Sequence, residues 1–348
     1  MFKYLLRKIF YGLLVMLGII VVVFFLFQGF GDPSRLIIGQ RADAATQENI
    51  RKELNLDQPR WKQFLLYLND VSPVSIYTDE EIQARALKGV FIGGHTKLTL
   101  KFPYLRRSYQ TKKEVWDVLM EALPGTILLA VAAMVIATIF GISLGVLAAV
   151  KKDSWLDTSA IFTSVLGISA PSFFMGIVIA YLFGFVLSSY TGLHMTGSLF
   201  DTDPFAGRQL KLQNLILPAI TLGIRPMSII AQLTRGSLLD VLDQDYIRTA
   251  YAKGVSKRKV IWRHALRNAL NPVITAITGW FAELLAGAFF VEYIFGWKGI
   301  GKITVDALSK LDFPIVMGSV LITSSFFIVI NILADWLYGV IDPRVRMS

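Results

Sequence analysis

Residues 245–273 read DYIRTAYAKGVSKRKVIWRHALRNALNPV, a stretch that carries seven Lys or Arg and one acidic residue. Strongly apolar sequence flanks it on both sides. Gly254 divides the stretch into two segments of helix-compatible composition, and glycine readily adopts the positive φ of a helix C-terminus. Ser256 can cap a second helix that starts at Lys257. The stretch therefore predicts a helix, a glycine turn and a second helix, set between two apolar segments.

The second helix has an apolar face and a basic remainder. The apolar face consists of Val260, Ile261, Ala265 and Leu266, with Trp262 beside it; the basic residues are Lys257, Arg258, Lys259, Arg263 and Arg267. Three interpretations compete: an anchor for anionic lipid, a basic loop that only orients the chain, or a rigid knob gripped by a cytoplasmic partner. A loop without ordered structure needs no glycine break between two helical patterns, which favours the knob.

The composition indicates a membrane protein. Of the 348 residues, 54% are hydrophobic and 17% are charged, against about 45–50% and about 25% in soluble domains. The chain contains no cysteine, which excludes disulfides, thiolate catalysis and cysteine-ligated metals. We interpret the net charge of +10 as the basic excess that orients membrane loops, and not as a nucleic-acid-binding surface.

The apolar residues form six candidate membrane spans. A bilayer core of about 30 Å requires about 20 helical residues. The candidates are residues 9–29, 123–150, 158–187, 213–236, 272–295 and 314–338. Pro171 lies in the middle of the third span and predicts a kink or a split into two helical pieces. We count it as one span, because two crossings there would reverse every later loop.

The loops give the spans a direction. Six crossings place all the basic segments on one side, and the positive-inside rule makes that side the cytoplasm. These segments contain Lys3, Arg7, Lys8, Lys151, Lys152, Arg235, the stretch 245–273, Arg344 and Arg346. Both termini are then cytoplasmic. The first span is interpreted as a retained anchor, since its apolar run is long and no small-x-small cleavage site follows it. The expected fold is an all-α polytopic membrane protein with six transmembrane helices.

The long segment 30–122 is expected outside the cytoplasm as a mostly helical insert. It contains 14 Lys or Arg and 12 Asp or Glu. Pro59 indicates the start of a helix, and the alternation in 97–102 predicts a strand. Capping-box spacing occurs at Thr78 with Glu81 and at Thr111 with Glu114. The residues alone do not separate a structural cap from a docking surface for an external partner.

No catalytic or metal site is visible in the sequence. A phosphate-binding loop of the G-x-x-x-x-G-K-[ST] type is missing, and the three histidines lack metal-ligand spacing. The glycines in 296–302, GWKGIGK, predict a turn after the fifth span. Ile300, Ile303, Ala307, Leu308 and Leu311 share one face, which predicts a short amphipathic helix after that turn. The chain is not expected to be an enzyme.

Few charged residues lie within the spans, and three of them form the candidate translocation path: Arg225, Glu283 and Asp335. An ionised side chain at mid-membrane costs about 2.5–3.5 kcal/mol on insertion scales, so it should face protein or water. Arg225 is on an inward-running span and Glu283 on an outward-running one, at similar depths. We expect them to approach each other or to line one aqueous path; a purely structural ion pair is the alternative. Asp335 lies near the inner end of the sixth span.

The basic stretch resembles the cytoplasmic "EAA" loop of bacterial ABC importer permeases, and is most similar to the dipeptide/oligopeptide/nickel branch. That branch typically has R-T-A-x-A-K-G, then R-H-A-L-R-N-A, then P. The matching residues are Arg248, Thr249, Ala250, Ala252, Lys253, Gly254, Arg263, His264, Ala265, Leu266, Arg267, Asn268, Ala269 and Pro272. Further similar landmarks are LPGTILL at 123–129, APSFF at 170–174, VEYIFGWKGIG at 291–301 and IDPRVR at 341–346.

The resemblance implies the membrane half of an ATP-driven importer for peptides or similar small solutes in the bacterial cytoplasmic (inner) membrane. A second homologous permease subunit, two cytoplasmic ABC ATPase subunits that bind ATP and Mg, and an extracytoplasmic solute-binding protein would complete it, and no nucleic acid is involved. No cofactor is expected in this chain. The ATPase-coupling residues implied are Arg248, Thr249, Ala250, Lys253, Gly254, Arg263, His264 and Arg267.

The expected organisation follows from these assignments. It comprises a basic N-terminus with the first helix (1–29), the insert (30–122), a type-1 transmembrane core (116–335) containing the coupling loop (245–271), and a cytoplasmic tail (339–348). Two other functions remain open at this point. An ion-coupled secondary transporter would use Arg225, Glu283 and Asp335 as a relay, and a membrane scaffold would bind a partner through its outer cap.

Overall fold

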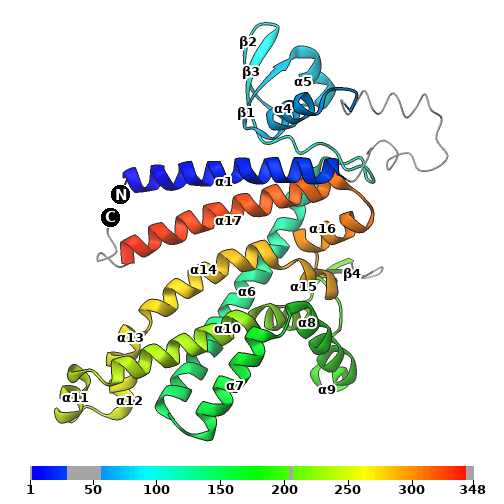
Figure 1. The fold of residues 1–348 in the computed structure, drawn as a ribbon. Helices are drawn as coiled ribbons and strands as arrows, with labels where there is room; N and C mark the ends of the chain where they lie inside the picture. Colours follow the sequence, from blue (N-terminus) through cyan, green and yellow to red (C-terminus); the bar gives the residue numbers. More distant parts are fainter. Residues whose placement is uncertain (1, 30–55, 204–206, 342–348) are drawn as a thin grey trace. The chain divides into compact units, whose positions relative to one another are not determined.

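The computed structural model describes residues 2–29, 56–203 and 207–341, and helices dominate it (Figure 1). The beginning of the insert at 30–55 and the basic tail with Arg344 and Arg346 lie outside the described residues. The chain divides into two compact units. We call residues 123–302 together with 326–348 and 1–5 the core unit, and residues 6–122 with 303–325 the insert unit.

Four helices among the described residues are long and apolar enough to cross a membrane: α1 (Phe2–Gln28), α6 (Val115–Val150), α10 (Gln213–Leu242) and α17 (Phe313–Ile341). A bent helix pair brings the number to five if it counts as one span. The span expected at 272–295 corresponds to α14 (Asn271–Gly287) and α15 (Phe289–Ile294), which are separated at Ala288. The all-α polytopic fold class is therefore confirmed.

The bent pair is the third expected span, and it breaks at Pro171. Helix α7 (Trp155–Ser169) ends before the proline, α8 (Ser172–Tyr181) begins after it, and the two directions differ by 110°. Ala170 has extended backbone torsions, which are those that a residue before proline prefers. The predicted split is confirmed. The chain continues through the π-helical segment η1 (Leu182–Val186), α9 (Ser188–Thr191) and the hairpin of β4 (Phe200–Asp203) and β5 (Gly207–Leu210).

The core unit is held together by a close seam between α6 and α10. A Cβ atom added to Gly141 would lie 2.8 Å from the carbonyl oxygen of Met227, and one added to Gly145 would lie 2.5 Å from that of Ala231. The two glycines are four residues apart, so they lie on one face of α6. Small residues at this spacing let helix backbones approach closely in membranes, where packing replaces the hydrophobic effect between helices.

The turn after α15 ties the end of the core unit to α6. Gly296 has φ +66°, and the Trp297 indole Nε1 donates to the carbonyl of Gly125 at 2.9 Å. The Ile300 amide donates to the Thr126 hydroxyl at 2.9 Å. Buried Glu292 accepts from the amide of Lys302 at 3.2 Å, at the start of α16 (Ile300–Ser309). The turn and the short helix expected from GWKGIGK are both confirmed.

The insert unit packs α4 (Arg60–Val71) against α1. The Phe24 ring lies 5.2 Å from that of Phe64 and 5.6 Å from that of Tyr67. The beginning of α17 lies beside α1, and Phe27 is 5.2 Å from Phe313 between ring centres (Figure 1). The helix expected after Pro59 is confirmed. So is the capping box of Thr78 and Glu81, which begins α5 (Asp79–Arg85).

The second expected capping box, of Thr111 and Glu114, does not form a helix start. Helix α6 begins at Val115, and Glu114 instead forms an ion pair with Arg107 at 3.9 Å. The preceding turn is organised by Asp312, whose carboxylate accepts from the Tyr109 amide at 2.9 Å and from the Ser108 hydroxyl at 2.5 Å. A contact between segments about 200 residues apart thus replaces a local cap.

The insert also contains a three-stranded antiparallel sheet, ordered β1 (Val74–Thr78), β3 (Thr96–Lys101) and β2 (Gly89–Gly93). Only β3 was expected. One face of the sheet covers buried Asp70, which pairs with Arg85 and Arg106 and accepts from the Tyr77 hydroxyl at 3.1 Å. The other face exposes six aliphatic side chains: Val74, Ile76, Val90, Ile92, Leu98 and Leu100.

The α6–α10 seam predicts a sharp difference between two Gly→Ala variants. Gly145→Ala places a methyl group against the backbone of α10, and such overpacking costs about 1–3 kcal/mol. Gly18→Ala is the matched control, because Gly18 lies in α1 and no atom lies within 4 Å of its added Cβ. Thermal unfolding of the purified chain in detergent should show a lower Tm for Gly145→Ala and an equal or higher Tm for Gly18→Ala. Equal Tm values for both variants would contradict the seam.

Candidate functional site

The basic stretch folds as a helix, a glycine turn and a second helical segment. Helix α11 spans Asp245–Ala252, and Gly254 has φ +76°. The Gly254 amide donates to the Tyr251 carbonyl at 2.9 Å, and the Val255 amide donates to the Ala250 carbonyl at 3.2 Å. These two bonds form a Schellman motif, which satisfies the last carbonyl groups of the helix. The role expected for Gly254 as a helix-ending residue with positive φ is confirmed.

The second segment begins where expected but is less regular than expected. It comprises α12 (Lys257–Lys259), the π-helical η2 (Val260–Ala265) and α13 (Leu266–Ala269). Ser256 occupies the N-cap position but its side chain makes no capping hydrogen bond, so that expected contact is wrong. The π-helical turn was not expected. Such turns break the regular 3.6-residue period inside helices and often occur at functional sites.

The stretch is anchored to the ends of two core helices by buried aliphatic side chains. The residues that it contributes are Ile247, Val260, Ile261, Ala265, Leu266 and Ala269. They pack with Val146 and Ala149 at the end of α6 and with Leu238 near the end of α10. The apolar face expected on the second helix is thus buried against the core. Because both halves of the stretch share this cluster, the stretch forms a stiff projection and not a free loop.

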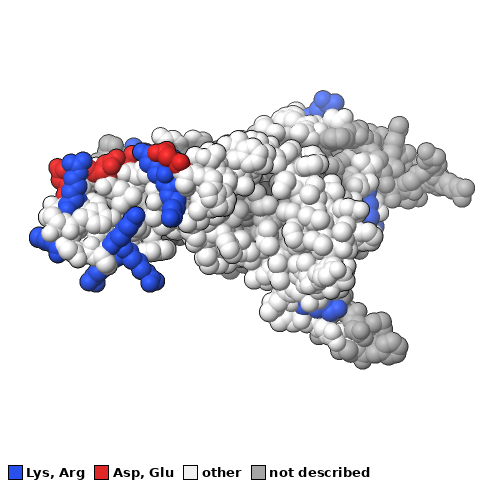
Figure 2. Space-filling view, turned by 90° about the horizontal axis from the view of Figure 1, so that it is seen from below, with Lys and Arg blue, Asp and Glu red and all other residues white. Residues whose placement is uncertain are grey.

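The polar residues of the stretch remain accessible. Of those proposed to couple to an ATPase, Ala250 and His264 are partly buried and the others are exposed: Arg248, Thr249, Lys253, Gly254, Arg263 and Arg267. Figure 2 shows Lys and Arg side chains projecting from the end of the molecule that carries this stretch. An open groove of about 540 Å³ lies beside them, lined by Ser256, Arg258, Lys259, Trp262 and Arg263. The sequence placed Trp262 only beside the apolar face, yet its side chain lines this groove and is 54% exposed.

A buried ion pair joins α7 to α10 near the same ends of these helices. The Arg235 guanidinium donates to both carboxylate oxygens of Asp157, at 2.5 and 2.7 Å. The exposed fractions of the two side chains are 24% for Arg235 and 4% for Asp157. Bidentate pairs of this kind fix orientation as well as contributing energy. The sequence used Arg235 only as an orienting charge and gave no role to Asp157.

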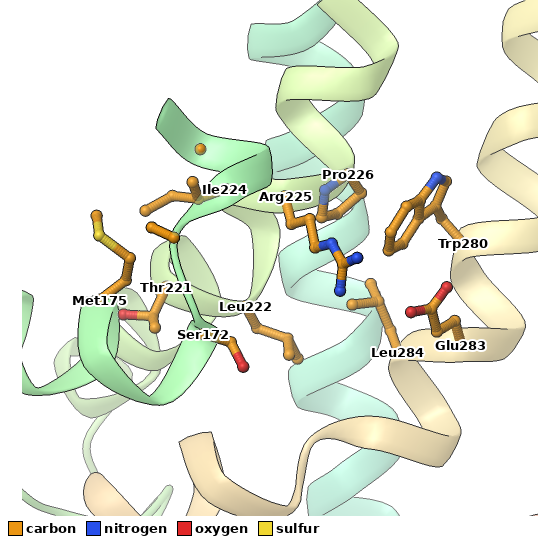
Figure 3. Close-up of a pocket in the computed structure, with 12 residues that line it drawn as sticks. Ser172, Met175, Thr221, Leu222, Ile224, Arg225, Pro226, Trp280, Glu283 and Leu284 are labelled. Atoms are coloured by element: carbon orange, nitrogen blue, oxygen red, sulfur yellow. The ribbon is translucent and has the colours of Figure 1, made fainter. Parts of the chain in front are cut away.

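A cavity of about 90 Å³ lies where the α7–α8 break meets the middle of α10 and α14. Figure 3 shows Arg225 from α10 pointing toward Trp280 and Glu283 of α14, with Ser172, Met175 and Thr221 on the other side. The Arg225 guanidinium carbon lies 5.3 Å from the centre of the Trp280 ring, a cation–π distance. Within the described residues, no ion pair shorter than 4.0 Å joins Arg225 to Glu283.

The structure therefore brings two of the three candidate path residues together. Arg225 and Glu283 line one cavity, as the second of the two expected arrangements requires, and they do not form a direct ion pair. Asp335 lies on α17 and is not among the residues that line the cavity. Trp280 and Ser172 line it but were not singled out from the sequence. In the described part of the chain, no group of three His, Cys, Asp or Glu side chains is arranged to hold a metal ion.

Comparison with known proteins identifies the family to which this chain belongs. Residues 141–347 match the family described as "Binding-protein-dependent transport system inner membrane component", and residues 1–130 match the corresponding N-terminal family. The chain belongs to this family. The permease is 35% identical over 366 residues to the "Dipeptide transport system permease protein DppB" of Escherichia coli (strain K12), covering 99% of each chain.

Two further relatives are similar to the permease along most of its length. The "Glutathione transport system permease protein GsiC" of Escherichia coli (strain K12) is 35% identical over 348 residues, with 99% of each chain covered. The "Di/tripeptide transport system permease protein DppB" of Pseudomonas aeruginosa (strain UCBPP-PA14) is 34% identical over 331 residues, with 91% of this chain and 90% of the relative covered. These likenesses support an ABC importer permease over the ion-coupled transporter, and a multi-pass inner-membrane protein.

The Asp157–Arg235 pair predicts coupled losses of stability in the permease. Asp157→Asn leaves the Arg235 guanidinium without its partner, a change that costs about 3–5 kcal/mol for a buried pair and less here because Arg235 is partly exposed. We expect a clear fall in Tm for Asp157→Asn and for Arg235→Gln, and a double variant whose fall is smaller than the sum.

Arg248→Gln is the control for this cycle, because its pair with Asp245 is long, at 3.7 Å, and both side chains are mostly exposed. Surface pairs contribute little, so its Tm should equal that of the unchanged permease. Strictly additive changes in the double variant would show that Asp157 and Arg235 do not interact.

Proposed function

We propose that this permease is one of two membrane subunits of an ABC importer for peptides, driven from the cytoplasm through residues 245–271. A second homologous permease would complete the pathway, and two ATPase subunits would bind ATP and Mg. An extracytoplasmic solute-binding protein would deliver the solute, and both termini of this chain would face the cytoplasm. The single observation that carries the proposal is that the basic stretch is a stiff projection anchored to α6 and α10.

A projection of this kind suits force transmission. A partner that closes around the exposed basic residues pulls on α11 and α12, and the buried side chains of Ile247, Val260 and Leu266 pass that displacement to α6 and α10. A flexible loop would absorb the same movement. The exposed groove beside Trp262 and Arg263 offers the apolar and cationic contacts that a protein partner uses at an interface hot spot.

The peptide assignment is supported by the relatives, whose printed names refer to dipeptide, di/tripeptide and glutathione transport. The cavity is also suited to small polar solutes, since it combines one cation, one anion and an aromatic ring with hydroxyl groups. The assignment of transport without catalysis by this chain is part of the proposal, with ATP hydrolysis given to the separate subunits.

Two substitutions at Gly254 test the coupling. Gly254→Val forces a β-branched residue to φ +76°, a strain of about 1–3 kcal/mol that the glycine avoids. Gly254→Asn is the matched control, because asparagine tolerates this conformation, and no atom lies within 4 Å of a Cβ added at Gly254. We expect the valine variant to lose ATP-driven dipeptide uptake by about tenfold, the factor that corresponds to about 1.4 kcal/mol, and the asparagine variant to keep most of it.

Uptake is measured in proteoliposomes that contain the complete importer, with the amount of each variant in the membrane quantified. ATP hydrolysis by the same vesicles is recorded, since a coupling defect separates hydrolysis from uptake. Unchanged uptake by Gly254→Val at normal membrane levels would remove the role of the turn in coupling.

A further inference from the structure

The cavity between the α7–α8 break, α10 and α14 contains two opposite charges that do not neutralise each other. Arg225 interacts with the face of Trp280, and this leaves the edge of its guanidinium free to donate hydrogen bonds. Glu283 accepts no hydrogen bond and forms no ion pair with any described residue. Both side chains are exposed to the cavity (Figure 3). Unpaired charges in the middle of membrane helices are costly unless water or a ligand solvates them.

We propose that this cavity is a transit site for zwitterionic peptides, in which Arg225 binds the terminal carboxylate and Glu283 binds the terminal ammonium group. The proposal rests on the function proposed above and adds the chemical rule by which the pathway recognises its solute. A guanidinium forms two parallel hydrogen bonds with a carboxylate. A carboxylate is the natural acceptor for the three N–H groups of an ammonium ion.

Recognition of the termini fits the size of the cavity. Its volume of about 90 Å³ is well below the about 300–1,000 Å³ of pockets that enclose whole ligands. The site can therefore hold charged end groups while the peptide side chains extend beyond it. Every unmodified peptide carries these two end groups whatever its side chains are, so a site that reads only the termini accepts many sequences. The remaining lining is mostly apolar and uncharged, including Leu222, Leu284 and Met175.

The rest of the lining explains why the two charges stay apart. Pro226 follows Arg225 in α10, and the Arg225 guanidinium lies against the ring of Trp280. Trp280 is one helical turn before Glu283 on α14. This cation–π contact gives the guanidinium an interaction that does not involve the Glu283 carboxylate. The arrangement keeps both charges ready for a solute, because binding does not first require an internal ion pair to break.

The absence of native cysteine allows a direct test in the complete importer. Ser172 is exposed and lines the cavity, so Ser172→Cys provides one thiol whose rate of modification by a small maleimide reports occupancy. Ser169→Cys is the matched control, since Ser169 is exposed at the end of α7 but does not line the cavity. Mass measurement of this chain distinguishes its modification from that of partner subunits.

Four probes distinguish recognition of the peptide's ammonium terminus from recognition of its carboxylate terminus: dialanine, N-acetyl-dialanine, dialanine amide, and the doubly blocked N-acetyl-dialanine amide. In the Ser172→Cys variant, we expect dialanine to halve the rate of maleimide modification at a lower concentration than any of the other three probes. Each blocked terminus should raise this half-protecting concentration by about tenfold, because a hydrogen bond to a charged group is lost. Modification in the Ser169→Cys control should not respond to any probe.

Two further variants assign each end to a residue. In the Ser172→Cys background, Arg225→Gln should weaken protection by dialanine about tenfold but leave that by dialanine amide unchanged, since the amide has no carboxylate to lose. Glu283→Gln should weaken protection by dialanine but leave that by N-acetyl-dialanine unchanged. A structural role for either residue would instead change protection by all probes alike.

The outcomes separate this inference from the proposed function. Equal protection by free and blocked peptides, or no protection by dialanine in an importer that takes up dialanine with ATP, overturns the transit site and leaves the permease assignment intact. An importer that fails to take up any peptide with ATP overturns the proposed function itself.

Discussion

The close approach of α6 and α10 is the constraint on which the rest of the core depends. Gly141 and Gly145 let the backbone of α10 lie against α6, and no side chain larger than hydrogen fits there without displacement. In lipid, helices gain little from burying apolar surface against each other, so this contact must come from packing. The seam fixes α10 in two places that matter: its middle carries Arg225 to the cavity, and its end carries Leu238 to the basic projection.

Much of the helical architecture could be predicted from the sequence because the signals are local. Pro171, Gly254 and the capping box at Thr78 each act within a few residues, and each produced the expected structure. The apolar runs formed helices, although the run expected at 272–295 is divided at Ala288. Prediction from the sequence was weaker where contacts between distant segments of the chain determine the local structure. Thr111 and Glu114 do not form a capping box, and Asp312 organises the turn that contains Thr111 instead. The strands β1 and β2 exist only through pairing with β3.

The same distinction applies to the candidate site. The charges of Arg225 and Glu283 stand out in apolar segments, so the sequence identified them, and their depth along the spans predicted a shared environment. Trp280 and Ser172 gave no such signal, because aromatic and hydroxyl residues are common in membrane helices. Asp335 shares the charge signal but does not line the cavity, and it lies near the end of α17 and not in the middle of that helix.

The Asp157–Arg235 pair has a mechanical consequence. It fastens the start of α7 to α10, close to where α10 meets the basic projection, while the far end of α7 is the break that borders the cavity. Gly167, near that break, also packs closely on α10, since a Cβ atom added there would lie 2.3 Å from the Ser228 hydroxyl oxygen. A displacement applied at the ion pair therefore moves α7 and α10 together as one rigid lever, and the break at Pro171 is the point at which α8 can turn relative to them.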